Sequence, residues 1–130
     1  MTQENIEVVQ TAYADINNAD DPRLNRLHEN VEVYDHDIMD AGEYRGHAGF
    51  TRWTEDWASA WAEFTIEPEE FLDVGDHVVM AFSMKATGLT SGVAVERQDA
   101  MVFEVRDGKI VRIDYYNSRE QALNAVGLAG

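Results

Sequence analysis

The sequence lacks cysteine, has only two lysines and two prolines, and contains no hydrophobic run long enough to cross a membrane. Without cysteine there is neither a disulfide framework nor a thiolate metal site. The opening residues, MTQENIEVV, lack the basic segment and apolar run of a secretory signal. We therefore expect a cytoplasmic protein in which residues 1–130 form a single domain.

Positive charge is scarce, because 10 Lys and Arg residues stand against 25 Asp and Glu residues, for a formal net charge of -15. Nucleic-acid binding requires clustered cations that displace counterions from phosphates, so we expect no nucleic-acid partner. The sequence also lacks a glycine-rich phosphate loop, a nucleophile elbow and a dinucleotide fingerprint, so no cofactor is expected. No membrane partner is expected either, because no segment is long and apolar enough to span a membrane. We interpret the acidic residues as a solvated shell.

Two long segments carry apolar residues at helical spacing. Over residues 5–18 the apolar positions are three, four and three residues apart, which predicts an amphipathic helix. Over residues 47–63 similar spacing predicts a helix with an aromatic face. That face carries Phe50, Trp53, Trp57 and Trp61. Between these helices, Asp21 followed by Pro22 predicts a short helix that ends near His28.

The remaining segments have strand character. Residues 31–35 alternate apolar and polar side chains, which places Asp35 on the same face as two valines. Residues 37–46 are polar and contain two glycines, so they are predicted to form a loop. Longer strands are expected over residues 64–74, 77–87 and 93–116.

The longest of these stretches is broken at Asp107 and Gly108, a pair that predicts a tight hairpin turn. Ser118 is predicted to cap a final helix, with Gly127 near its end. Helices that precede a run of antiparallel strands indicate an α+β fold. A long, bent antiparallel sheet with helices on one face makes a cone, which we expect to enclose an apolar pocket for a small organic molecule.

Five segments in this order carry a family resemblance: VVQTAYADINNAD, VEVYDHD, YRGHAGFTRW, VFEVRDGKIVRIDYY and SREQALNAVGL. With them the chain resembles the nuclear transport factor 2-like superfamily, in particular its SnoaL-like and ketosteroid-isomerase-like members. The resemblance implies one domain with a cystatin-like, cone-shaped fold. Its members include isomerases, aldol-type cyclases, dehydratases, epoxide hydrolases and non-catalytic binding modules, so function must be inferred from the site.

The resemblance implies a carboxylate base at the end of the first strand, where Asp35 stands. A carboxylate that faces valines is partly desolvated, which makes it a better proton acceptor near neutral pH. An alternative of equal weight is that Asp35 only ends the strand and accepts hydrogen bonds from the loop amides of His36 and Asp37.

A second carboxylate candidate lies on the strand before the Asp-Gly turn. The ketosteroid-isomerase-like members have an acidic hydrogen-bond donor where Met101 stands here. Asp99 lies two residues earlier on the same strand face, and neighbouring Arg97 favours its ionised form, which cannot donate. On the first helix Tyr13 matches the aromatic residue of SnoaL-like sequences rather than the isomerase tyrosine. The resemblance therefore favours SnoaL-like acid/base chemistry, with Asp35 or Asp99 as the acid/base group.

Epoxide hydrolases of the superfamily use an Asp-Arg-Asp trio. Asp35, Arg97 and Asp99 supply those residue types, but neighbouring Arg97 and Asp99 on one strand do not reproduce the trio, so this activity ranks third. Four histidines lie on different elements, so no metal site is expected, although His36 neighbours carboxylates.

The resemblance implies that the third helix and the last strands line the pocket. The candidate substrate-binding residues are Trp53, Trp57, Arg97, Met101, Phe103, Ile113, Tyr115 and Asn117. Plain core packing is the alternative role for the tryptophans. Arg112 and Asp114 are expected to face away from the pocket as an exposed pair.

Two classes of function remain open. The first is a cofactor-independent proton-transfer enzyme, an isomerase, aldol-type cyclase, hydrolase or dehydratase, acting on a small hydrophobic substrate. Asp35 is then the base, and Tyr13, Tyr115 or Asp99 polarises an oxygen. The second is a non-catalytic ligand-binding or dimerisation module. The superfamily also implies a homodimer through the outer sheet face. That face is predicted to carry Ala100, Val102 and Tyr116 beside Glu96, Gln98 and Glu104.

Overall fold

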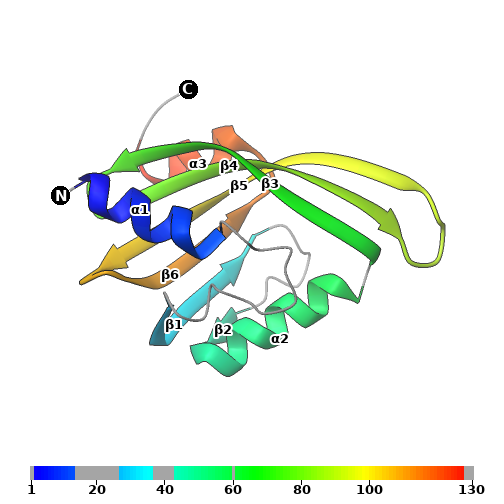
Figure 1. The fold of residues 1–130 in the computed structure, drawn as a ribbon, viewed down its shortest axis with the longest axis horizontal. Helices are drawn as coiled ribbons and strands as arrows, with labels where there is room; N and C mark the ends of the chain where they lie inside the picture. Colours follow the sequence, from blue (N-terminus) through cyan, green and yellow to red (C-terminus); the bar gives the residue numbers. More distant parts are fainter. Residues whose placement is uncertain (1, 14–26, 37–42, 60, 128–130) are drawn as a thin grey trace.

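The computed structural model describes residues 2–13, 27–36, 43–59 and 61–127, and within them the chain has the predicted α+β fold (Figure 1). The elements in chain order are α1 (Thr2–Tyr13), β1 (Leu27–Asp35), β2 (Glu43–Arg45), α2 (Gly46–Ala58), β3 (Trp61–Val74), β4 (His77–Gly88), β5 (Ala94–Arg106), β6 (Lys109–Tyr116) and α3 (Arg119–Ala125). No described helix is long and apolar enough to cross a membrane.

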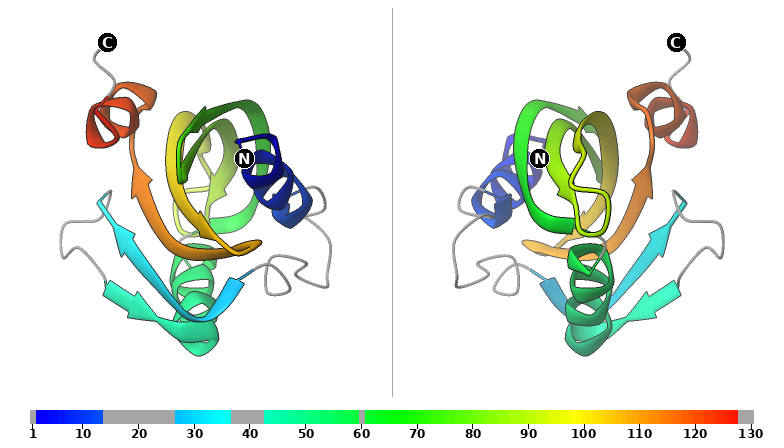
Figure 2. Two further views of the ribbon diagram at one scale, coloured as in Figure 1. Left: turned by 90° about the vertical axis from the view of Figure 1, so that its left-hand side faces the viewer. Right: turned by 90° about the vertical axis from the view of Figure 1, so that its right-hand side faces the viewer.

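The strands form one curved, unclosed sheet in the order β2-β1-β6-β5-β4-β3 (Figure 2). The pairings of β1 with β2, β3 with β4, β4 with β5 and β5 with β6 are antiparallel, as expected. The pairing of β1 with β6 is parallel, which the sequence did not predict. Parallel neighbours need a crossover connection. Here the connection from β1 to β6 consists of β2, α2, β3, β4 and β5.

The predicted hairpin between β5 and β6 is confirmed. Asp107 and Gly108 have φ angles of 51° and 77°, both in the left-handed region that a two-residue hairpin turn requires. Ser118 caps α3 as predicted, because its side chain accepts a hydrogen bond from the backbone N–H of Gln121. Gly127 follows the helix with a φ of 83°.

Three predicted boundaries are wrong. Trp61 lies in β3, where it pairs with Gly88, although its spacing had placed it on the aromatic helix that ends at Ala58. Leu27 and His28 belong to β1 rather than to the end of a helix. In place of part of a loop, β2 pairs with β1. In each case strand pairing outweighs local spacing. Residues 14–26 and 37–42, with the rest of the predicted second helix and loop, lie outside the described residues.

The two faces of the sheet carry different helices. Helices α1 and α2 pack on the face that we call the inner face, around a core cluster that includes Val9, Phe50, Met80, Phe82 and Phe103. Helix α3 packs on the opposite, outer face, so the expectation of helices on one face is wrong for α3 (Figure 2).

The outer-face contact of α3 also changes the predicted dimer surface. Ala100 is fully buried and Val102 is 4% exposed, because Ala122 and Leu123 of α3 pack against them. These two residues are therefore unavailable as an exposed contact surface. The correction could not be read from strand alternation alone, since alternation places a side chain on a face but does not say what covers that face.

Candidate functional site

Asp35 is the last residue of β1, and its side chain is fully buried on the inner face with Val31 and Val33. From α2, the indole N–H of Trp53 donates a hydrogen bond to Asp35 Oδ2 at 2.8 Å. Burying a carboxylate is costly unless donors compensate for the lost water. The Trp53 indole supplies such a donor, so Asp35 is held by α2 as well as by its own strand. Its inner-face position beside the two valines is the one that strand alternation predicts.

The alternative role predicted for Asp35 can be compared with the backbone contacts at the end of the strand. The N–H of His36 donates to the carbonyl oxygen of Tyr115 at 2.9 Å. That N–H thus takes part in the pairing of β1 with β6, and the role of Asp35 as an acceptor for loop amides stays a prediction. Asp37 lies outside the described residues.

Asp99 is the second buried carboxylate, 2% exposed, on the inner face of β5. The hydroxyl of Tyr115 donates a hydrogen bond to Asp99 Oδ2. Arg97 Nη2 lies 3.3 Å from Oδ1 and 3.2 Å from Oδ2. A guanidinium this close favours the ionised carboxylate, which accepts and cannot donate. The arrangement agrees with the expected effect of Arg97.

Tyr115 connects the two carboxylates. In the parallel register of β1 and β6 it stands beside Asp35, and on its other side it pairs with Met101 of β5. The rings of Trp53 and Phe82 contact the Tyr115 ring edge-on, with centroid distances of 6.2 and 5.8 Å. Three adjacent strands and α2 therefore bring two carboxylates, a phenol and an indole together within an otherwise apolar core.

The other predicted site residues differ in their surroundings. Trp53, Met101, Phe103, Ile113 and Tyr115 are buried in the inner core cluster. The Arg97 side chain is 27% exposed, and Asn117 is exposed after the end of β6.

Two predicted residues have no described side chain. Tyr13 ends α1 and Trp57 lies in the last turn of α2, but their side chains lie outside what the structure describes. Two contacts went unpredicted. Phe82 is a neighbour of Tyr115 that only the alternation of β4 indicates. The Trp53–Asp35 hydrogen bond has no local sequence signal, because it joins two residues that lie 18 positions apart in the chain, on α2 and β1.

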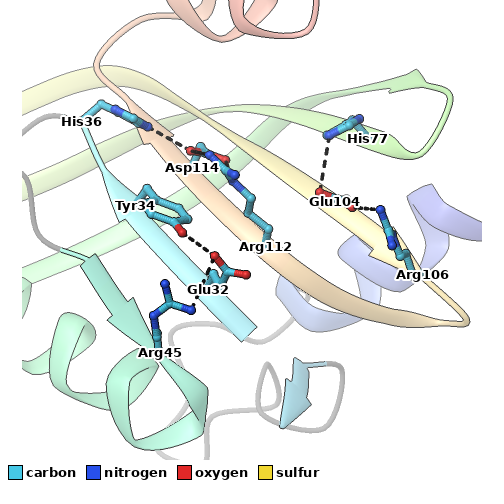
Figure 3. A network of polar contacts seen from close by, with 9 residues as sticks. All are labelled: Glu32, Tyr34, His36, Arg45, His77, Glu104, Arg106, Arg112 and Asp114. Atoms are coloured by element: carbon cyan, nitrogen blue, oxygen red, sulfur yellow. Dashed lines mark hydrogen bonds and ion pairs between the residues drawn. The ribbon is translucent and has the colours of Figure 1, made fainter. Parts of the chain in front are cut away.

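Arg112 and Asp114 face the outer side as predicted, but Asp114 is buried rather than exposed (Figure 3). Arg112 Nε and Nη2 donate to Asp114 at 2.8 and 3.1 Å. His36 Nε2 lies 2.9 Å from Asp114 Oδ1. His36 therefore contacts an outer-face acid, and within the described part of the chain no group of three or more His, Cys, Asp or Glu residues is arranged to hold a metal ion.

An open groove lies at the end of the sheet formed by β3, β4 and β5. Its volume is about 480 Å³, and its lining includes Phe64, Ala86 and Val95. Val95 alternates with Arg97 and Asp99 along β5, so the three side chains share the inner face. Apolar groove residues therefore lead along one strand to the Arg97–Asp99 pair.

Comparisons with known proteins agree with this fold. The model of the SnoaL-like domain matches residues 9–113. No curated protein matches the sequence. One similar solved structure is TerC co-crystallised with polyporic acid, with 24% identity, coverage of 95% of this chain and 98% of that chain, and a TM-score of 0.80.

Two further structures are similar at lower identity. A hypothetical protein with a ketosteroid isomerase-like fold from Catenulispora acidiphila DSM 44928, in complex with trimethylamine, is 15% identical, with coverage of 94% and 93% and a TM-score of 0.74. A putative SnoaL-like polyketide cyclase from Jannaschia sp. CCS1 is 16% identical, with coverage of 99% and 95% and a TM-score of 0.76. With most of its length matched by the family model, this chain belongs to the SnoaL-like domain family of the nuclear transport factor 2-like superfamily.

Proposed function

We propose that the protein binds a small hydrophobic organic molecule at the inner face and moves a proton on it without a cofactor, with Asp35 as the base. The observation that supports this most is the fully buried Asp35 carboxylate held by the Trp53 indole at 2.8 Å. The indole fixes the direction of the Asp35 carboxylate, and a general base must be held within hydrogen-bond reach of the proton that it takes. The reaction class is proton abstraction beside a carbonyl group.

Asp99 has a supporting role in this proposal. Arg97 stabilises its ionised form, which makes it a weaker base than a carboxylate without a neighbouring cation. Its oxygen accepts the Tyr115 hydroxyl and so fixes the direction of the phenol. Tyr115 then presents its ring and oxygen to a ligand that lies over Asp35, its neighbour in register.

The ligand class follows from the surroundings of the site and from similar proteins. The groove of about 480 Å³ lies beyond Arg97 on β5 and is not lined by Asp35 or Tyr115, and its volume falls in the range of sites for small organic molecules. TerC was crystallised with polyporic acid, and the Catenulispora protein with trimethylamine, both small molecules. These cases support a small ligand for this chain and leave its identity to experiment.

A deuterium-incorporation experiment tests the proposal even while the product is unidentified. A library of small ketones and hydroxyquinones is first screened for binding by the shift in Tm. Compounds that bind are then incubated with the protein in D₂O, and the deuterium they gain at carbon is measured by mass spectrometry. Protein-dependent incorporation, proportional to protein concentration, is the expected result. Binding by several compounds with no incorporation above the buffer rate contradicts the proposal.

The second candidate is a non-catalytic ligand-binding module. It is favoured by the packing around the carboxylates, since Phe82, opposite Asp99, and Met101, opposite Tyr115, are buried core residues. In this case the Trp53 contact stabilises Asp35 as a structural acid. Tm shifts without deuterium incorporation are its expected result. A homodimer and a cytoplasmic location, drawn from the resemblance and composition, are proposed for either case.

A further inference from the structure

We propose that His36 is a positioning residue for Asp35, acting through a clamp on the outer face. The outer-face clamp consists of His36, Asp114, Arg112 and Tyr116 (Figure 3 shows the first three). The role of this outer-face clamp depends on the proposed function in one respect, namely that Asp35 is the base. Its physical claim, that the clamp fixes the Asp35 carboxylate, is testable without a substrate.

The clamp ties the end of β1 to three consecutive residues of β6. His36 Nε2 lies 2.9 Å from Asp114 Oδ1, and the backbone N–H of His36 donates to the carbonyl oxygen of Tyr115 at 2.9 Å. The His36 ring stacks on Tyr116, with ring centroids 4.6 Å apart and planes 5° apart. Position 36 is therefore held by a polar side-chain contact, a backbone hydrogen bond and a ring stack.

Asp114, the acceptor in the clamp, is itself held rigidly. Arg112 donates two hydrogen bonds to Asp114, and such a bidentate pair fixes the plane of the carboxylate. The hydrogen bond with Asp114 also raises the pKa of Arg112, so the guanidinium stays charged. The Arg112 guanidinium carbon lies 4.3 Å from the ring centroid of Tyr34. Because Asp114 only accepts, the His36 Nε2 atom must carry the proton between them.

The position of the clamp explains why it acts on Asp35. Successive strand side chains point to opposite faces, so His36 on the outer face lies directly behind Asp35 on the inner face. Asp35 is also the last residue of β1, and directly after it the backbone is paired with β6 by the hydrogen bond from the His36 N–H to the Tyr115 carbonyl oxygen. Without its side-chain contacts, position 36 keeps only the backbone hydrogen bond to Tyr115, so we infer that the Asp35 carboxylate is held less firmly at its 2.8 Å distance from the Trp53 indole nitrogen.

The same face offers a matched control. His77 lies 3.9 Å from Glu104, and Arg106 pairs with Glu104 at 2.8 Å (Figure 3). This group repeats the histidine, acid and arginine of the clamp. It lies on β4 and β5 rather than behind Asp35. A His77→Leu variant therefore removes an equivalent surface histidine without touching the strand end that carries the base.

The experiment follows the ¹H–¹⁵N NMR signal of the Trp53 indole N–H, which reports the hydrogen bond to Asp35 Oδ2. The sequence has three tryptophans, and Trp53→Phe assigns the signal. We expect His36→Leu and Asp114→Asn to move this signal toward its position in Asp35→Ala, which removes the acceptor of the indole N–H. His36→Gln, whose amide donates to Asp114, should restore most of the wild-type position. His77→Leu should leave the signal unchanged.

The deuterium-incorporation assay gives a second readout. A misplaced reacting group costs up to about 10²-fold in rate, so His36→Leu should slow incorporation about 10-fold or more at unchanged ligand Kd. An unchanged Trp53 signal in both His36→Leu and Asp114→Asn overturns the inference, as does an equal shift in His77→Leu. If His36→Leu fails to fold, the signal of Asp114→Asn compared with that of His77→Leu still decides it. If the Trp53 signal shifts as expected but Asp35→Asn still incorporates deuterium at the full rate, the clamp is upheld. Asp35 is then rejected as the base.

Discussion

Tyr115 stands beside Asp35 in the parallel register of β6 and β1, while its hydroxyl donates a hydrogen bond to Asp99 on the next strand. Two carboxylates that are 64 positions apart in the chain, at 35 and 99, thereby both neighbour Tyr115, Asp35 through strand register and Asp99 through a hydrogen bond. The parallel pairing of β1 and β6 produces this arrangement, because it places Asp35, at the end of β1, next to Tyr115 of β6.

The Trp53 hydrogen bond should stabilise the fold. Removing one partner of a buried hydrogen bond costs about 1–3 kcal/mol, so Trp53→Phe should lower the free energy of unfolding by about 1–3 kcal/mol. Trp61→Phe is a matched control, because the Trp61 indole nitrogen is buried without a hydrogen-bond partner among the described residues. It should cost less than Trp53→Phe in urea unfolding. Equal losses for the two variants argue against the Trp53–Asp35 bond.

Tyr115 and Asp99 should be energetically coupled. Residues joined by a buried hydrogen bond show interaction energies of about 0.5–3 kcal/mol in double-mutant cycles. We expect a coupling in this range between Tyr115→Phe and Asp99→Ala, measured by urea unfolding, because alanine removes the acceptor. Purely additive losses from the two single variants would show that the hydroxyl does not bind Asp99 in solution.

Tyr44 predicts a pH dependence of stability. Burial, together with the hydrogen bond that its hydroxyl donates to Asp56 Oδ2 at 2.9 Å, raises the pKa of Tyr44. The folded state therefore favours the neutral phenol. This contribution to stability is fully present below the unfolded pKa of about 10 and is lost as the pH rises through the higher folded value.

Unfolding by urea at several pH values measures this effect. Above about pH 10, the wild type should lose stability more steeply than Tyr44→Phe. Burial and the charge of Asp114 also raise the pKa of Tyr116, which is present in both proteins, so the difference between them isolates Tyr44. Parallel pH profiles for the two proteins contradict the prediction.

Homodimerisation stays a prediction, but the contact surface expected for it differs from the one inferred from the sequence. Because α3 covers Ala100 and Val102, a contact through the outer face must use other residues, such as those of β1 and β6. Sedimentation equilibrium at micromolar concentration should give twice the mass of the chain. A single-chain mass across that concentration range rejects the dimer.

Alternation and turn chemistry predicted much of the fold and part of the site. The positive φ angles at Asp107 and Gly108, the cap at Ser118 and the inner-face positions of Asp35 and Asp99 are local properties, readable from neighbouring residues. Each depends on backbone stereochemistry or on a period of two along one strand.

The missed features are tertiary. Trp61 has helical spacing from Trp53 and Trp57, yet pairing with β4 places it in a strand. Spacing likewise gave no sign that α3 covers the outer face or that His36 contacts a buried Asp114. The Trp53–Asp35 hydrogen bond depends on how α2 crosses β1, and no local pattern encodes that crossing.

The central claim, that Asp35 is the base, is tested most directly by the rate of deuterium incorporation into a bound compound with Asp35→Asn. The substitution is nearly isosteric and keeps an acceptor for the Trp53 indole, so the fold and the ligand Kd should be retained. An amide cannot take the proton, so incorporation should fall about 10²–10⁴-fold. Full incorporation by a folded Asp35→Asn protein, with Asp99→Asn inactive, contradicts the assignment and makes Asp99 the base.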